Sequence, residues 1–121
     1  MHEMGIVSGI LEASTAAARR EGALSIREIH VRVGDLTEIV DEAMRFAFEA
    51  LTPGTLAEGA QLVIERVAAV SRCAECSAEF SHGRFDIVCP QCEGFICEML
   101  HGRELEVSHI EVALPGEEDK P

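Results

Sequence analysis

Four cysteines constrain this chain more than any other feature of its sequence. They form two Cys-x-x-Cys pairs separated by twelve residues, namely Cys73 with Cys76 and Cys89 with Cys92. Each pair can direct two sulfurs onto one ion from a tight turn, and two such turns complete the tetrahedron that Zn²⁺ prefers. Because sulfur fills all four positions, none is left for water or a substrate. The spacing therefore predicts a structural zinc site.

The segment that carries these cysteines, residues 71–102, has 32 residues. Chains shorter than about 40 residues seldom bury enough apolar surface to fold alone, so we expect bound metal to stabilise a separate zinc-binding domain here. Two disulfides, plain buried thiols, or iron in a rubredoxin-like site are the alternatives. The chain opens without the basic and apolar regions of an export signal, which predicts a reducing cytoplasm and favours thiolates over disulfides.

The rest of the chain has the hydrophobic patterns of an α+β fold. Apolar residues recur at helical spacing in two segments, and apolar and polar residues alternate, or β-branched residues cluster, in three others. The predicted helices cover residues 4–20 and 41–51, and the predicted strands cover residues 28–33, 62–70 and 105–112. Asp41 is the expected N-cap of the second helix.

These elements predict two helices packed on a three-stranded sheet, with a four-cysteine, zinc-ribbon-like module inserted before the last strand. The predicted helix and strand domain comprises residues 1–70 and 103–121, and the zinc-binding domain comprises residues 71–102. Residues 115–121 are charged and poor in apolar side chains, so we expect a disordered tail.

Composition argues against several classes of function. The chain carries 22 Asp and Glu against 10 Lys and Arg, a formal net charge of −12, so binding to the polyanionic backbone of nucleic acid is not expected. No apolar run approaches the roughly 20 residues that span a bilayer, and we expect no membrane association. The common nucleotide-binding and metalloprotease motifs are absent from the sequence, so no enzymatic activity is predicted.

The first three residues can form a second kind of metal site. The Met1 amine, the His2 backbone nitrogen and the His2 ring can close two fused chelate rings around an ion that displaces the amide proton. Ni²⁺ and Cu²⁺ favour such tetragonal nitrogen and oxygen surroundings, and Glu3 or another acidic group can supply a fourth donor. A frayed terminus with an incidental histidine fits the same composition.

Several segments together resemble one known family. They are Met1-His2-Glu3-Met4 at the start of an amphipathic helix, Val31-Arg32-Val33-Gly34-Asp35, the helix start Asp41-Glu42-Ala43-Met44-Arg45-Phe46-Ala47-Phe48, the paired cysteines, and Gly102-Arg103-Glu104-Leu105. In this order and spacing they resemble the hydrogenase nickel-incorporation family, HypA/HybF, over nearly the whole chain.

The resemblance implies a cytoplasmic nickel metallochaperone that is not itself an enzyme. It implies that Ni²⁺ binds at Met1, His2, Glu3 and Asp41, and that structural Zn²⁺ binds at the four cysteines. The implied partners are a HypB-type GTPase and the precursor of the [NiFe]-hydrogenase large subunit, with urease maturation in some relatives. A homodimer is compatible with this function.

Two competing classes of protein share the cysteine pattern. One is a zinc-ribbon interaction module with no second metal, and the other is a rubredoxin-like electron carrier with iron. The chain also departs from the family pattern at His101 and at the additional thiol Cys97. We expect Cys97 to be a buried small apolar residue and His82 and His101 to be solvated. His30 falls on the polar face of its strand and is assigned no role.

Overall fold

The computed structural model describes residues 2–116, whose contacts divide the chain into two compact units. The helical unit comprises residues 2–31, 39–65 and 106–116, and the cysteine unit comprises residues 32–38 and 66–105. The predicted domain boundaries at residues 71 and 102 stay a prediction, because a compact unit need not fold independently. No helix within residues 2–116 is long and apolar enough to cross a membrane. The predicted tail, residues 115–121, lies largely outside the described part of the chain.

Helix α1 spans His2–Arg20 and buries one continuous face. The buried positions follow the spacing of three, four and seven that places side chains on one side of a helix: Val7, Ile10, Leu11, Ser14 and Ala18. The helix ends where the sequence predicts, because Gly22 adopts a φ of 71° and the Ala23 N–H bonds to the Ala18 carbonyl at 3.0 Å.

Helix α2 spans Asp41–Leu51 and packs against α1. Met44, Ala47 and Phe48 form its buried face. The prediction that Asp41 is the N-cap was wrong by one position. Val40 occupies the cap without a side-chain hydrogen bond, and Asp41 is the first helical residue. Its carboxylate still lies in the first turn, where the helix dipole favours negative charge.

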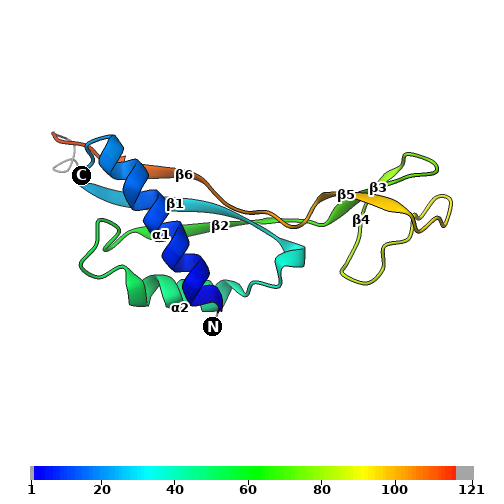
Figure 1. Cartoon of the computed structure of the whole chain (residues 1–121), viewed down its shortest axis with the longest axis horizontal. Coiled ribbons are helices and arrows are strands. Elements are labelled where there is room, and N and C mark those ends of the chain that lie inside the picture. The colour runs from blue at the N-terminus through cyan, green and yellow to red at the C-terminus, as the bar shows by residue number, and fades with distance from the viewer. Residues whose placement is uncertain (1, 117–121) are drawn as a thin grey trace. The chain divides into compact units, whose positions relative to one another are not determined.

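The helical unit is built on the three-stranded sheet β2-β1-β6, with β1 in the centre. The strands are β1 (Ser25–Gly34), β2 (Gln61–Val67) and β6 (Leu105–Ala113). Ile29, Val31 and Val33 alternate along β1 and are completely buried, and both helices lie on one face of the sheet (Figure 1). The predicted α+β class, with two helices and three strands, is confirmed.

The cysteine unit has its own small sheet, which the sequence analysis did not predict. Strand β3 (Val70–Cys73) lies between β4 (Glu79–Ser81) and β5 (Cys97–His101), and both pairings are antiparallel. The predicted strand over residues 62–70 is therefore two strands, since β2 ends at Val67 and β3 begins at Val70.

The backbones of Gly34 and Gly102 approach each other more closely than side chains would permit. A Cβ atom on Gly34 would lie 2.2 Å from the carbonyl carbon and oxygen of Gly102. The Gly34 N–H donates to the Glu104 carbonyl at 2.8 Å, and the Leu36 N–H, in the 3₁₀ turn Asp35–Thr37, donates to the Gly102 carbonyl at 2.8 Å. Glycine is required at position 34 because any Cβ would separate these bonded strands.

Replacement of Gly34 by alanine should therefore destabilise the protein. Overpacking of this kind costs about 1–3 kcal/mol or more, because the clash is with backbone atoms that cannot rotate away. Gly9→Ala is the matched control: its Cβ would meet nothing within 4 Å, and an alanine inside a helix should stabilise by about 0.5–1 kcal/mol. Urea unfolding of the metal-loaded protein measures both effects, and equal midpoints for the two variants would contradict the role of Gly34.

Candidate metal centre

Each Cys-x-x-Cys pair sits in a turn with the same local hydrogen bonds. The N–H of the first cysteine donates five residues ahead, from Cys73 to Ala78 at 2.9 Å and from Cys89 to Gly94 at 2.8 Å. The residue after each second cysteine has a left-handed backbone, with φ of 67° at Ser77 and 64° at Glu93. The two turns are thus repeats of one structure.

The two turns bring all four sulfurs together. The four Sγ atoms lie within 4.8 Å of one another, with 3.5 Å between Cys73 and Cys92 and 3.5 Å between Cys76 and Cys89. Sulfurs bound to one Zn²⁺ at about 2.3 Å in a tetrahedron stand roughly 3.8 Å apart. The thiol cluster therefore has the dimensions of a tetrahedral metal site, and no disulfide links these cysteines.

Backbone groups surround the thiol cluster closely. The N–H groups of Glu75 and Gln91 each donate to the sulfur two residues earlier, at 3.4 Å. A Cβ on Gly94 would lie 3.3 Å from Cys92 Sγ and 2.8 Å from a Glu75 carboxylate oxygen. Gly94 thus lets the backbone pass beside the sulfurs, a requirement that the spacing of the cysteines alone did not reveal.

The backbone hydrogen bonds favour the thiolate form at the first cysteine of each pair. The N–H groups of Cys76 and Glu75 lower the pKa of the Cys73 thiol below its ordinary value. The N–H of Cys92 lowers the pKa of the Cys89 thiol to about 7, against the opposing effect of burial. Cys73 and Cys89 therefore form the thiolate, which is the form that binds metal cations, more readily than an ordinary cysteine.

At the second cysteine of each pair, the surroundings raise the pKa of the thiol and favour its protonated form. At Cys92 the Gly94 N–H lowers the pKa, but the bond with Cys73, burial and the other thiols together raise the pKa to about 12. Four thiolates repel one another in one site, so a metal ion must displace the proton of Cys92 when it binds. Metal affinity at this site should fall as the pH decreases.

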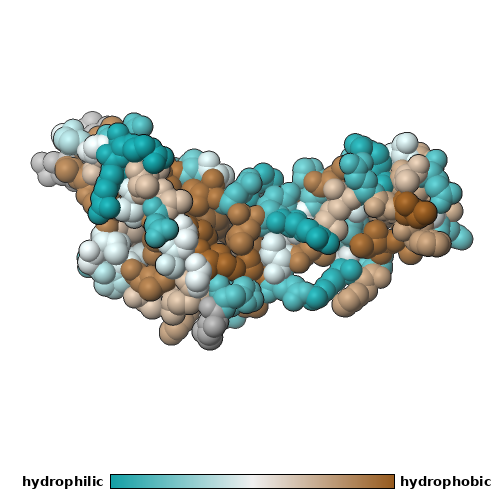
Figure 2. Space-filling view, viewed as in Figure 1, coloured by the Kyte–Doolittle hydropathy of each residue, from teal (hydrophilic) through white to brown (hydrophobic). Residues whose placement is uncertain are grey.

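The cysteine unit has almost no hydrophobic core apart from these sulfurs. Its buried residues are Val33 and Gly34 in the segment 32–38, and Ala69, Ser71, Cys73, Cys89 and Gly102 in the segment 66–105. The large apolar side chains Phe85 and Phe95 are 89% and 77% exposed, and Figure 2 shows apolar residues at the surface of this unit. Bound metal is the contribution that can replace the missing core.

The remaining thiol and histidines of this unit lie outside the thiol cluster. Cys97 on β5 lies directly opposite Cys73 on β3 in the register of the two strands, and its side chain is half-buried. Burial raises the pKa of its thiol. We expected His82 to be solvated, but its ring contacts the Ser71 hydroxyl and the Gly83 carbonyl, each at 2.7 Å. His101 is exposed and lies 3.2 Å from Glu104.

The residues predicted to bind nickel are placed only in part. Met1 lies outside the described residues. His2 and Glu3 open α1 with 3.9 Å between His2 Nε2 and a Glu3 carboxylate oxygen, and Asp41 opens α2. His2, Glu3 and Asp41 do not form a group of three converging ligand atoms within residues 2–116. The nickel site stays a prediction.

Comparison with known proteins identifies the family. The family model described as "Hydrogenase/urease nickel incorporation, metallochaperone, hypA" matches residues 1–112. The chain belongs to the HypA family. Among its relatives, the hydrogenase maturation factor HypA of Geotalea uraniireducens is 41% identical over 112 residues, covering 93% of this chain and 99% of that protein. HypA of Chlorobium luteolum is 39% identical over 117 residues, covering 97% and 100%.

Solved structures of the HypA family share the fold. The solution structure of the Ni metallochaperone HypA from Helicobacter pylori has a TM-score of 0.65 at 21% identity, covering 93% of this chain and 97% of that one. A second structure, titled solution structure of HypA protein, has a TM-score of 0.71 at 24% identity, covering 93% and 96%. At this identity the similarity concerns the fold alone.

Replacement of a cysteine in the thiol cluster should have a much larger effect than replacement of Cys97. Cys92→Ser removes one of four thiolates. Metal affinity should therefore fall by more than the roughly 10–100-fold that is typical when a residue hydrogen-bonded to a metal ligand is lost. Cys97→Ser should leave metal binding unchanged. Titration with Co²⁺, whose thiolate charge-transfer absorption reports sulfur ligands directly, compares the two variants. Loss of that absorption in Cys97→Ser would assign Cys97 to the site.

Proposed function

We propose that this protein binds Ni²⁺ at its amino terminus and delivers it to the precursor of the [NiFe]-hydrogenase large subunit. Membership of the HypA family supports this proposal. The observation that carries it is the position of His2 and Glu3 in the first turn of α1, with the His2 side chain 66% exposed. A ligand at this position can be reached by a partner protein.

The start of α1 suits the proposed chelate. The first four N–H groups of a helix have no partner within that helix. The His2 amide nitrogen can therefore bind an ion without breaking a helical hydrogen bond. Together with the Met1 amine and the His2 ring it offers Ni²⁺ the nitrogen surroundings this ion favours, and Glu3 or Asp41 supplies a further oxygen.

The four cysteines hold a structural Zn²⁺ in this proposal. Their sulfurs fill every position of a tetrahedron, so this ion would stabilise the cysteine unit and would not be passed on. Zinc in the thiol cluster also keeps four soft sulfur ligands away from nickel, which thiolates would otherwise bind. A reducing cytoplasm suits the five free thiols.

Nickel binding should depend on an unextended amino terminus. A Gly-Ser extension before Met1 keeps His2, Glu3 and Asp41 but removes the terminal amine from its chelate ring, so Ni²⁺ affinity should fall at least tenfold. His2→Ala should do at least as much damage, and Asp41→Ala should weaken binding less. Calorimetry with Ni²⁺ on zinc-loaded protein measures these affinities.

Cys97→Ser is the control for this experiment, because it alters a side chain that is not among the proposed ligands. Its nickel affinity should equal that of the unmodified protein, and zinc content should stay at one ion per chain in every variant. If the extended protein binds Ni²⁺ as tightly as the unmodified one, the terminal amine is not a ligand and the proposed chelate is wrong.

A HypB-type GTPase is the proposed partner in nickel transfer, with the hydrogenase precursor, or in some relatives urease, as the recipient. Mixing this chain with such a GTPase should give a complex at tens of micromolar, and nickel should exchange between the two proteins more quickly than through solution. An unrelated GTPase is the control. Absence of a complex in light scattering at these concentrations would count against the partnership.

A further inference from the structure

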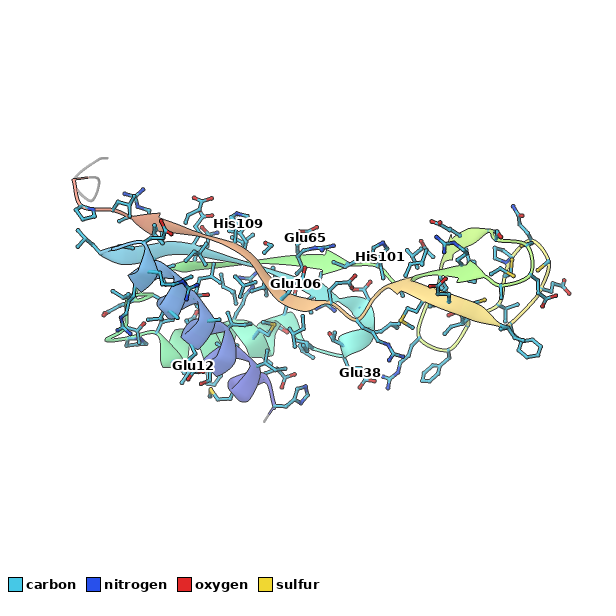
Figure 3. The ribbon with its side chains drawn as sticks, turned by 45° about the horizontal axis from the view of Figure 1, so that its top comes forward. Glu12, Glu38, Glu65, His101, Glu106 and His109 are labelled. Carbon is cyan, nitrogen blue, oxygen red and sulfur yellow. The ribbon has the colours of Figure 1, made fainter. Side chains whose placement is uncertain are left out.

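A second group of side chains of the types that bind metal ions lies on the face of the helical unit's sheet opposite its two helices (Figure 3). His30 on β1 and His109 and Glu111 on β6 place one ligand atom each within 4.8 Å of one another. We call these three residues the histidine cluster. Figure 3 shows His109 on the face of the sheet opposite the two helices. His109 and Glu111 are exposed and His30 is half-buried, and none of the three residues belongs to the thiol cluster or to the proposed amino-terminal site.

The distances within the histidine cluster suit a shared ion. His30 Nε2 lies 3.7 Å from a Glu111 carboxylate oxygen, close to the roughly 3.4 Å that separates two ligands held at about 2.0–2.1 Å in a tetrahedron. The two imidazole rings stack with their centroids 3.9 Å apart and an interplanar angle of 23°. Because the nitrogen lone pairs lie in the ring planes, one ring must turn before both rings can bind the same ion. The same His30 nitrogen, Nε2, donates a hydrogen bond to a Glu28 carboxylate oxygen at 2.7 Å, so an ion that binds this nitrogen must displace that proton, and Glu28 then stands beside the ion as a second carboxylate.

Ser108 orients His109 for metal binding. Its hydroxyl donates to the His30 carbonyl at 3.2 Å and lies 3.3 Å from His109 Nδ1. Since the only hydroxyl hydrogen is directed to the carbonyl, the contact with the ring requires Nδ1–H to donate to the Ser108 oxygen. The lone pair of His109 then resides on Nε2, and a second hydrogen-bonding residue fixes the ring, as is usual for metal-binding histidines.

We propose that His30, His109 and Glu111 form an additional binding site for a divalent late transition metal ion such as Ni²⁺, Cu²⁺ or Zn²⁺. Imidazole nitrogens select these ions over Mg²⁺ and Ca²⁺, which prefer oxygen. The Glu28 and Glu111 carboxylates and the chain's net charge of −12 attract a cation to this face. The three residues leave coordination positions open, so an ion bound here would exchange readily with solvent or with another protein.

The competing explanation is that the histidines only stack and bond to nearby carboxylates. Solvent-exposed pairs of this kind are common and add little stability. This explanation predicts no response of the cluster to metal. The two explanations therefore differ in a measurable way that does not depend on the proposed amino-terminal site.

The test is a Ni²⁺ titration of the full zinc-loaded chain carrying His2→Ala, which removes the amino-terminal imidazole. Calorimetry should show a remaining nickel site whose affinity falls at least tenfold in His30→Ala and in His109→Ala, and also falls in Glu111→Gln. His101→Ala is the matched control, because His101 also lies beside a carboxylate but has no second histidine. It should leave the remaining site unchanged.

Nuclear magnetic resonance of the unsubstituted chain provides the second measurement. The ring signals of His30 and His109 should shift or broaden with Ni²⁺, and Mg²⁺ at the same concentration should leave them in place. If Ni²⁺ leaves both rings unaffected, or if nickel binding is equal in His109→Ala and His101→Ala, the site does not exist. If instead His2→Ala alone has no effect on nickel binding, the amino-terminal proposal fails while the histidine cluster is still tested.

Discussion

Repulsion among four sulfurs is the constraint on which the cysteine unit depends. Two of its few buried residues, Cys73 and Cys89, are members of the thiol cluster, and two of its three phenylalanines, Phe85 and Phe95, are exposed. Without a cation, protons must hold the charge of the cluster down, as the high pKa of Cys92 indicates. A divalent ion removes the repulsion and joins segments that share little hydrophobic surface. The three short strands of this unit are arranged around that requirement.

Local patterns predicted most of the helical unit. The C-terminal ends of α1 and α2 and the existence of three sheet strands followed from apolar periodicity and from clusters of β-branched residues, although α1 begins two residues earlier than predicted and β2 ends three residues earlier. The paired cysteines likewise predicted which sulfurs converge. Features that depend on contacts between distant segments were not predictable: the close approach at Gly34, the passage of Gly94 beside the sulfurs, and the strands of the cysteine unit.

The histidine cluster is a candidate site that could not be predicted from the sequence for the same reason, because it depends on contact between distant segments. His30 alone on a polar strand face predicts nothing, and His109 is 79 residues further along the chain. Only the pairing of β1 with β6 places the two rings in contact. The Asp41 error has a different origin, because a cap and a first helical residue differ by one position and both favour aspartate.

Each cysteine turn is closed by a hydrogen bond of its own, from Cys73 to Ala78 and from Cys89 to Gly94, and the first turn is also bonded from the Ala74 N–H to the Ile96 carbonyl at 2.9 Å. Each cysteine pair therefore lies in a turn closed by its own hydrogen bond, and an ion bound by all four sulfurs would link the two turns. Loss of the ion would then separate the two turns without removing the hydrogen bond that closes either one.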